Sequence, residues 1–165
     1  LAESCPADKF AAFIEAHPGY KVISYANTTA AVKALTDVLV TSANACEIVE
    51  SFPKDQPLIF GPDRNLGAYI NARTGRQMLL WDGACLVHER FSVEKILEIK
   101  RQHPKAKILA HPECKGPVLK LADVIGSTAA LLKYTIQSDE QEFIVVTESG
   151  RKTRPARHSF PCRPK

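Results

Sequence analysis

An internal duplication with a period of 86 residues most constrains the fold of this 165-residue chain. Shifting the sequence over itself by 86 residues aligns residues 17–27 with residues 103–113, and residues 35–43 with residues 121–129, without a gap. A register kept across this many apolar runs and helical patterns is hard to obtain by chance. The period is too long for a solenoid repeat and indicates two duplicated domains.

Short aliphatic runs alternate with amphipathic helical patterns along both copies. This alternation is typical of βαβ units, whose parallel strands are buried on both faces. We predict strands over residues 21–25, 37–41, 57–60, 78–81, 107–111, 123–126 and 142–147, and helices over residues 8–17, 29–35, 44–52, 65–73, 92–102 and 127–137. The predicted fold class is α/β, with pseudo-symmetric, duplicated three-layer domains built on short parallel sheets.

The repeat and the charge distribution together predict the domain organisation. We expect one repeat unit over residues 1–75, a second over residues 76–150, and a basic tail over residues 151–165 that is disordered or aberrant. The tail holds six of the 22 basic residues, no acidic residue, and no apolar periodicity. Residues 1–150 therefore carry 16 basic and 18 acidic residues, a net charge of −2, which argues against nucleic-acid binding.

The apolar runs and the cysteines predict the compartment. The apolar runs are too short to span a bilayer and no signal peptide opens the chain, so we expect a cytoplasmic protein without a membrane partner. An odd number of cysteines without CxxC spacing favours free thiols or metal ligands over disulfides. These are Cys5, Cys46, Cys85, Cys114 and Cys162. The first residue is Leu, which suggests a fragment.

Repeat-related polar residues follow the predicted strands. Tyr25 and Asn27 occupy the same repeat positions as His111 and Glu113, at the carboxyl ends of strands, where open α/β sheets bind ligands. Ser42 and Thr128 also correspond, and we expect both at helix starts, where hydroxyls cap the helix and backbone N–H groups favour anions. Thr28 is the expected cap of the helix that follows Tyr25. These positions predict a small polyanion bound between two domains.

Cys85 follows a predicted strand and leaves it through Gly83. A thiolate in this place suits a soft metal or an iron–sulfur cluster, and His88 could face the same cavity. The alternative is that Cys85 is a small buried hydrophobe. Positions 86 residues to either side of Cys85 fall outside this chain. If each repeat gave one thiolate, three domains would build one three-cysteine cluster.

His111 and Glu113 stand two residues apart on one strand end, so both side chains can face one substrate. His111 is then a donor or proton shuttle and Glu113 a general base. The alternative is a capped turn with a solvated glutamate. Tyr25 is a ligand contact or a core residue with its hydroxyl at the rim. The Pro62–Gly67 segment is interpreted as a turn and a helix start, with little functional signal.

Six segments, taken together, resemble the bacterial and archaeal quinolinate synthase family. They occur in family order, span about residues 1–150, and are specific as a set. The segments are Tyr25-Ala26-Asn27-Thr28-Thr29, Thr41-Ser42-Ala43-Asn44, Pro62-Asp63-x-x-Leu66-Gly67, Trp81-x-Gly83-x-Cys85-x-x-His88, His111-Pro112-Glu113-Cys114 and Asp123-x-x-Gly126-Ser127-Thr128.

The resemblance implies three pseudo-symmetric α/β domains around a [4Fe–4S] cluster bound by one cysteine from each domain. It implies condensation of iminoaspartate with dihydroxyacetone phosphate to quinolinate for NAD synthesis, and an iminoaspartate-producing oxidase or dehydrogenase as a partner enzyme. Cys85 is then a cluster ligand, His88 an active-site neighbour, and Glu113, His111 and Tyr25 catalytic. The implied substrate-binding residues are Tyr25, Ala26, Asn27, Ser42, His111, Pro112, Glu113, Ser127 and Thr128.

Two departures from the family pattern concern the ends of the chain. The family's first cysteine ligand belongs immediately upstream of Leu1, and the third belongs after Gly150, where this chain turns into the basic tail. Cys162 lacks the family's surrounding residues and is not assigned. We therefore expect the chain alone to hold one ligand of three and to be inactive.

Two other classes of function remain open at this point. One is a zinc-dependent lyase or hydrolase that uses Cys85, His88 and His111, with Glu113 as base. The other is a non-catalytic module that binds a small phosphorylated or dicarboxylate metabolite.

Overall fold

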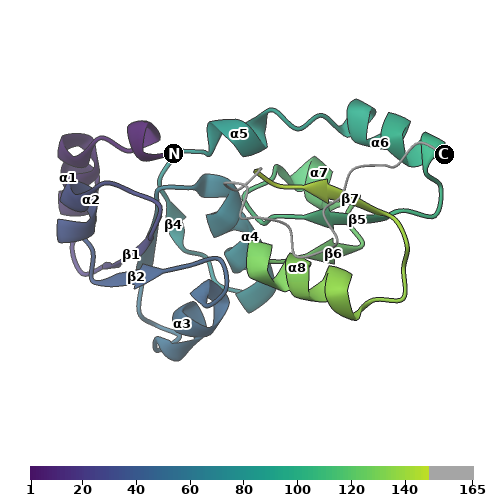
Figure 1. Cartoon of the computed structure of the whole chain (residues 1–165). Helices are drawn as coiled ribbons and strands as arrows, with labels where there is room; N and C mark the ends of the chain where they lie inside the picture. The colour runs from purple at the N-terminus through teal and green to yellow at the C-terminus, as the bar shows by residue number, and fades with distance from the viewer. Residues whose placement is uncertain (149–165) are drawn as a thin grey trace.

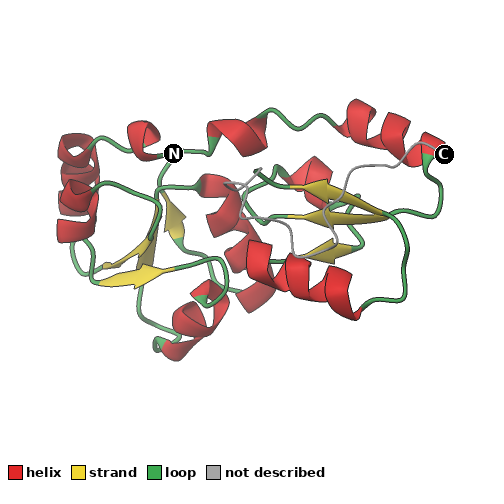
Figure 2. Cartoon of the chain, viewed as in Figure 1, coloured by secondary structure: helices red, strands yellow, loops and turns green. Residues whose placement is uncertain are grey.

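The computed structural model describes residues 1–148, which form two parallel β-sheets flanked by helices (Figures 1 and 2). The first sheet has the strand order β2-β1-β3-β4 and the second has the order β6-β5-β7. The strands are β1 (Lys21–Tyr25), β2 (Val38–Val40), β3 (Leu58–Gly61), β4 (Leu79–Leu80), β5 (Lys107–Ala110), β6 (Val124–Ile125) and β7 (Phe143–Val146). The predicted α/β class with short parallel sheets is confirmed, and each strand lies in a segment predicted from the sequence except β3, which extends one residue further, to Gly61.

The strand register repeats with the period found in the sequence. Ile23 of β1 lies opposite Val38 of β2, and 86 residues later Leu109 of β5 lies opposite Val124 of β6. The third strand of the second sheet is displaced by one residue, because Lys21 lies opposite Leu58 whereas Lys107 lies opposite Phe143. Equivalent third-strand positions are therefore 85 residues apart.

In each sheet, an aspartate carboxylate forms a hydrogen bond across the first strand pair. The Asp37 carboxylate accepts a hydrogen bond from the Val22 N–H at 2.8 Å, and the Asp123 carboxylate accepts one from the Ile108 N–H at 2.8 Å. Each carboxylate also pairs with a lysine on the neighbouring strand, Lys21 at 2.9 Å and Lys107 at 3.6 Å. Because a one-residue slip would break these bonds, the aspartates help to fix the register.

Helices cover both faces of the first sheet. Phe10 of α1 (Ala7–Glu15) and Val32 of α2 (Ala30–Ala34) pack on one face. The other face carries α3 (Ala45–Ser51) and α4 (Arg64–Thr74), with Val49 and Ile70 in the core. The spacing of the apolar residues in these four segments is helical, so the sequence predicted all four helices.

In the second unit, α6 (Val93–Gln102) and α7 (Gly116–Leu119) pack on one face of the sheet through Ile96 and Val118. Helix α8 (Thr128–Gln137) places Leu131 and Leu132 in the lining of a groove that also includes Leu109 and Val145. Helix α7, helix α5 (Leu86–Glu89) and the 3₁₀ turn η1 (Ala2–Ser4) were not predicted. Each has three or four residues, too few to show a period.

The division of the chain into two units stays a prediction. Strand β4 lies beyond residue 75 and still pairs with β3, so the first sheet extends past the expected boundary. The expected tail at residues 151–165 lies outside the described residues. Among residues 1–148, none of the helices is sufficiently long and apolar to span a membrane.

Candidate active site

Polar side chains that follow strands of both sheets meet beyond the carboxyl ends of those strands. Ser42 follows β2 of the first sheet, and His111 follows β5 of the second. The Oγ atom of Ser42 lies 3.1 Å from Nε2 of His111. This hydrogen bond joins residues 69 positions apart and places the corresponding edges of the two sheets against each other. Such strand ends are where open α/β sheets bind ligands.

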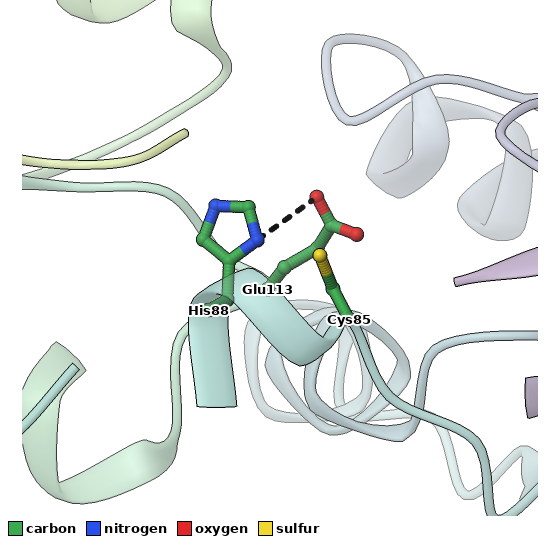
Figure 3. A group of neighbouring side chains, drawn as sticks. All are labelled: Cys85, His88 and Glu113. Atoms are coloured by element: carbon green, nitrogen blue, oxygen red, sulfur yellow. Dashed lines mark ion pairs between the residues drawn. The ribbon is translucent and has the colours of Figure 1, made fainter. Parts of the chain in front are cut away.

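Helix α5 aims two buried side chains at Glu113, as Figure 3 shows. Cys85 precedes the helix and His88 lies three residues later, so both side chains fall on one helical face. Leu86 and Val87, between them, are exposed. The donor atoms of Cys85, His88 and Glu113 all lie within 4.8 Å of one another, and the three residues are 5%, 1% and 3% exposed. A soft sulfur ligand, an imidazole and a hard carboxylate ligand, all able to bind a metal, therefore lie together in one buried position.

Asp63 fixes the backbone at Cys85. Its Oδ1 accepts from the Leu66 N–H at 2.7 Å and caps α4, while its Oδ2 accepts from the Cys85 N–H at 2.8 Å. Burial, aided by the charge of Glu113, raises the pKa of Asp63 to about 6. In the sequence alone, this segment shows little functional signal. Its available signal was an Asp three residues before Leu66, typical of a helix N-cap, but nothing in the local pattern connects it with Cys85.

Gly83 permits the close approach that brings Cys85 to Asp63. A Cβ atom at this position would lie 2.4 Å from the carbonyl oxygen of Pro62, so another residue would force the two segments apart. The carbonyl of Gly83 accepts from the Arg64 N–H at 2.7 Å. Glycine is therefore required at position 83, where the chain leaves the strand, because a side chain there would clash with the Pro62 backbone.

Glu113 is held beside two imidazoles. Its Oε2 lies 3.1 Å from Nδ1 of His111 and 3.7 Å from Nδ1 of His88. Nδ1 of His111 also accepts a hydrogen bond from the Glu113 backbone N–H at 3.4 Å, and Nε2 shares a hydrogen bond with the Ser42 hydroxyl, whose direction follows the tautomer of the ring. The two rings stack with centroids 5.1 Å apart. His111 therefore contacts both the backbone N–H and the carboxylate of Glu113.

Several atoms around Glu113 have unused hydrogen-bonding capacity. Within residues 1–148, both ring nitrogens of His88 and Oε1 of Glu113 are buried without a hydrogen-bond partner. Buried polar atoms in folded proteins are nearly always satisfied, so these atoms indicate a place prepared for a ligand. Burial also lowers the pKa of His88, against the opposing effect of Glu113, and favours its neutral form.

Tyr25 lies at the end of β1 and is half-buried. Burial and then the negative charge of Glu113 raise the pKa of Tyr25 to about 12, although a hydrogen bond with Ser42 lowers it in part. The hydroxyl therefore stays protonated at neutral pH and can donate to an anion. The electrostatic effect of Glu113 also places Tyr25 in its vicinity.

The remaining predicted residues form no hydrogen bond with this cluster in the described part of the chain. Pro112 and Ser127 are buried, Ala26 is half-buried, and Asn27 and Thr128 are exposed. Within residues 1–148, the side chains of Asn27 and Thr128 form no hydrogen bond with Glu113, His111 or His88. Their assignment to a substrate stays a prediction.

Three expected capping roles were wrong. Ser42 lies three residues before α3 and bonds His111 instead, while Asn44 precedes the helix and its side chain accepts from the Thr41 N–H. The next two caps each differ from the expected residue by one position. Thr29, not Thr28, caps α2, and Ser127, not Thr128, caps α8. Hydroxyl residues stand side by side in both pairs, and the local sequence does not decide which adopts the extended conformation of a cap.

Comparisons with known proteins point to one family. The family model described as "Quinolinate synthetase A protein" matches residues 1–159. A quinolinate synthase from a Synechococcus strain is 58% identical over 91% of this chain and 47% of its own length. A quinolinate synthase from Trichormus variabilis is 53% identical over 99% of this chain and 52% of its own length. The chain thus spans about half the length of the curated relatives it matches.

Proposed function

Because the chain belongs to the quinolinate synthetase A family, we propose that residues 1–148 form part of the active site of a quinolinate synthase. The proposed reaction of the complete protein condenses iminoaspartate with dihydroxyacetone phosphate, loses phosphate and water, and gives quinolinate for NAD synthesis. The observation that carries the proposal is the buried Glu113 carboxylate, which lies between two imidazoles and beside the Cys85 thiol where the two units meet.

Glu113 is the proposed acid and base of the reaction. A carboxylate that is 3% exposed is shielded from bulk water, so its proton exchanges with a bound substrate rather than with solvent. His111 supports this role, because its Nδ1 accepts from the Glu113 N–H at 3.4 Å and lies 3.1 Å from Oε2, which keeps an imidazole beside the carboxylate. Oε1, which has no partner within the described chain, is the atom left to accept or return a substrate proton.

The anionic groups of the substrates are the proposed ligands of the surrounding polar residues. Tyr25, with its pKa raised to about 12, offers a hydroxyl proton near Glu113. The backbone N–H groups at the start of α8 favour a phosphate or carboxylate, and Thr128, the first residue of that helix, is solvent-exposed. Other proposed substrate contacts follow the family motif: Ala26, Asn27, Ser42, His111, Pro112 and Ser127.

Cys85 is the residue that fits a [4Fe–4S] cluster. Among the four cysteines described, Cys5 packs in the core of the first unit, Cys46 packs against it, and Cys114 bonds the Val146 carbonyl. The Cys85 thiol instead lies with the unpartnered polar atoms of His88 and Glu113. When bound, a cluster with an open iron supplies Lewis-acid chemistry. The described residues contribute one thiol to it. The partner enzyme and the cytoplasmic location stay predictions.

Replacing Glu113 tests the proposed function in the complete protein. Glu113→Gln keeps the size of the side chain and removes its proton transfer, so we expect quinolinate production to fall by at least about 100-fold while the visible cluster spectrum persists. Glu47→Gln, an exposed glutamate on α3, is the matched control and should keep full activity. Normal turnover by Glu113→Gln would contradict the proposal. A binding module would be favoured if the unsubstituted complete protein binds the substrates without producing quinolinate and Glu113→Gln leaves that affinity unchanged.

A further inference from the structure

Cys85, His88 and Glu113 have the features of a site for a single metal ion. Their donor atoms converge within 4.8 Å, and Figure 3 shows the sulfur and the imidazole on the same side of α5, directed at the carboxylate. The three side chains are almost fully buried. Both ring nitrogens of His88 and Oε1 of Glu113 also lack a hydrogen-bond partner within residues 1–148, so donor atoms are free to bind an ion.

The charges around Glu113 favour a cation at this place. In the described part of the chain, the ion-pair partners of Glu113 are His88 and His111, and no Lys or Arg nitrogen lies within 4 Å of its carboxylate. A buried carboxylate without a cation is costly, and Asp63 adds a second buried carboxyl group nearby. A divalent ion bound by a Cys85 thiolate, a Glu113 carboxylate and a neutral imidazole would form a centre without net charge.

We propose that Cys85, His88 and Glu113 bind one zinc ion through sulfur, nitrogen and oxygen. Thiolate and imidazole ligands select zinc over magnesium or calcium. Ligand atoms in a tetrahedral zinc shell lie about 3.3–3.8 Å apart, given bonds of about 2.0–2.3 Å. The 3.7 Å between His88 Nδ1 and Glu113 Oε2 is near the upper end of this range, and the Cys85 sulfur lies within 4.8 Å of the other two ligand atoms, so side-chain movement alone can close the shell. The fourth position is left for water.

Residues outside the donor set hold two of the three ligands in place. Oδ2 of Asp63 accepts from the Cys85 N–H at 2.8 Å and fixes the start of α5. Nδ1 of His111 accepts from the Glu113 N–H at 3.4 Å and lies 3.1 Å from Oε2, so it holds the Glu113 backbone next to the site. Such hydrogen bonds from neighbouring residues to ligand residues are a regular part of metal sites and raise their affinity.

The zinc site deepens the proposed function, on which it rests for its biological consequence. The same Cys85 thiol is the proposed cluster ligand, so zinc and the cluster compete for it. Zinc also occupies Glu113, the proposed acid and base. The zinc form of the complete enzyme is therefore an inactive form, and zinc is an inhibitor that acts through this site. Metal binding by the chain itself can be measured without any activity assay.

Cobalt(II) titration of the metal-free, reduced 165-residue chain tests the site, because tetrahedral cobalt reports its ligands by absorption. We expect one equivalent to bind with a thiolate-to-cobalt charge-transfer band, and zinc to displace it. Cys85→Ser should remove the band, and His88→Gln and Glu113→Gln should each weaken binding at least about tenfold. Cys46→Ser is the matched control. Cys162→Ser tests the thiol outside the described residues, and both variants should keep the band.

Two results would overturn the zinc site. One is a charge-transfer band that survives Cys85→Ser; the other is cobalt affinity unchanged by both His88→Gln and Glu113→Gln. X-ray absorption at the zinc edge of the unsubstituted chain decides the matter even where a variant does not fold. One sulfur with two or three nitrogen or oxygen neighbours supports the site, and two or more sulfurs contradict it. Failure here leaves quinolinate production intact, whereas failure of the proposed function leaves cobalt binding intact.

Discussion

The two repeat units share a strand register but differ in how their sheets are covered within residues 1–148. Both faces of the first sheet are packed, and Phe60 on β3 is fully buried between α3 and α4. The equivalent position on β7 is Val145, which is 45% exposed and lines a groove of about 160 Å³ with Leu132 of α8. The backbone pattern of the repeat was thus retained while the side chains on one face diverged. Strand pairing and core packing are therefore specified by different residues.

The largest expected effect distinguishes the packed face of the first sheet, at Phe60, from the half-exposed face of the second sheet, at Val145. Phe60→Ala empties the centre of the first core and should lower the free energy of unfolding by about 3–5 kcal/mol. Val145→Ala removes a half-exposed side chain at the equivalent register position and should cost less than about 1 kcal/mol. Urea unfolding followed by circular dichroism measures both. Equal losses would mean that the second sheet is as well packed as the first.

The sequence predicted the strands and longer helices well because their information is local. Aliphatic runs such as residues 107–111 and helical spacing such as that of residues 92–102 need no distant partner to be recognised. The link from Asp63 to the Cys85 N–H spans 22 residues and depends on how α4 and α5 pack, so no local pattern contains it. The unpartnered atoms of His88 are likewise visible only in three dimensions.

The repeat predicted which strand ends carry the candidate site, but not how far each side chain reaches. Ser42 and His111 meet at 3.1 Å, in agreement with a ligand place between the units. Thr128, the repeat equivalent of Ser42, makes no corresponding bond within the described residues. The difference arises because the repeat fixes positions within each unit, whereas contacts between units depend on their relative orientation. That orientation depends on packing side chains that the two copies do not share.

The paired aspartates test whether the two registers are equally secured. Asp37→Ala and Asp123→Ala each leave a strand N–H group without its acceptor, so each should cost about 1–2 kcal/mol. The costs should agree within about 0.5 kcal/mol, because the two carboxylates accept equivalent backbone hydrogen bonds of the same length. Asp55→Ala, at an exposed aspartate, is the control and should change little. Urea midpoints at neutral pH give all three values, and a large inequality would show that the repeats are not energetically equivalent.

The Asp37 effect should also depend on pH with a definite sign. The Val22 N–H and then Lys21 hold the pKa of Asp37 below its usual value. Its stabilising effect is therefore fully present above pH of about 4, where the unfolded carboxyl is ionised, and is lost as the pH falls through the lower folded pKa. The difference in unfolding free energy between the unsubstituted chain and Asp37→Asn should stay constant from about pH 6 to pH 5 and shrink in urea titrations below that, as the unfolded carboxyl becomes protonated. A difference that grows on acidification would contradict the assigned contacts.

The smallest expected effect concerns the contact that joins the two units. Ser42→Ala removes the hydroxyl that bonds His111 Nε2, and a single partly buried hydrogen bond of this kind contributes about 0.5–1.5 kcal/mol. Ser51→Ala is the matched control, because that hydroxyl bonds only the Ile48 carbonyl within its own helix, and it should cost less. A double-mutant cycle with His111→Ala isolates the pair and should give a coupling of similar size. Zero coupling would mean that other contacts position the two units. Ser42 would then contribute no more stability through a contact between the units than its repeat equivalent Thr128 does.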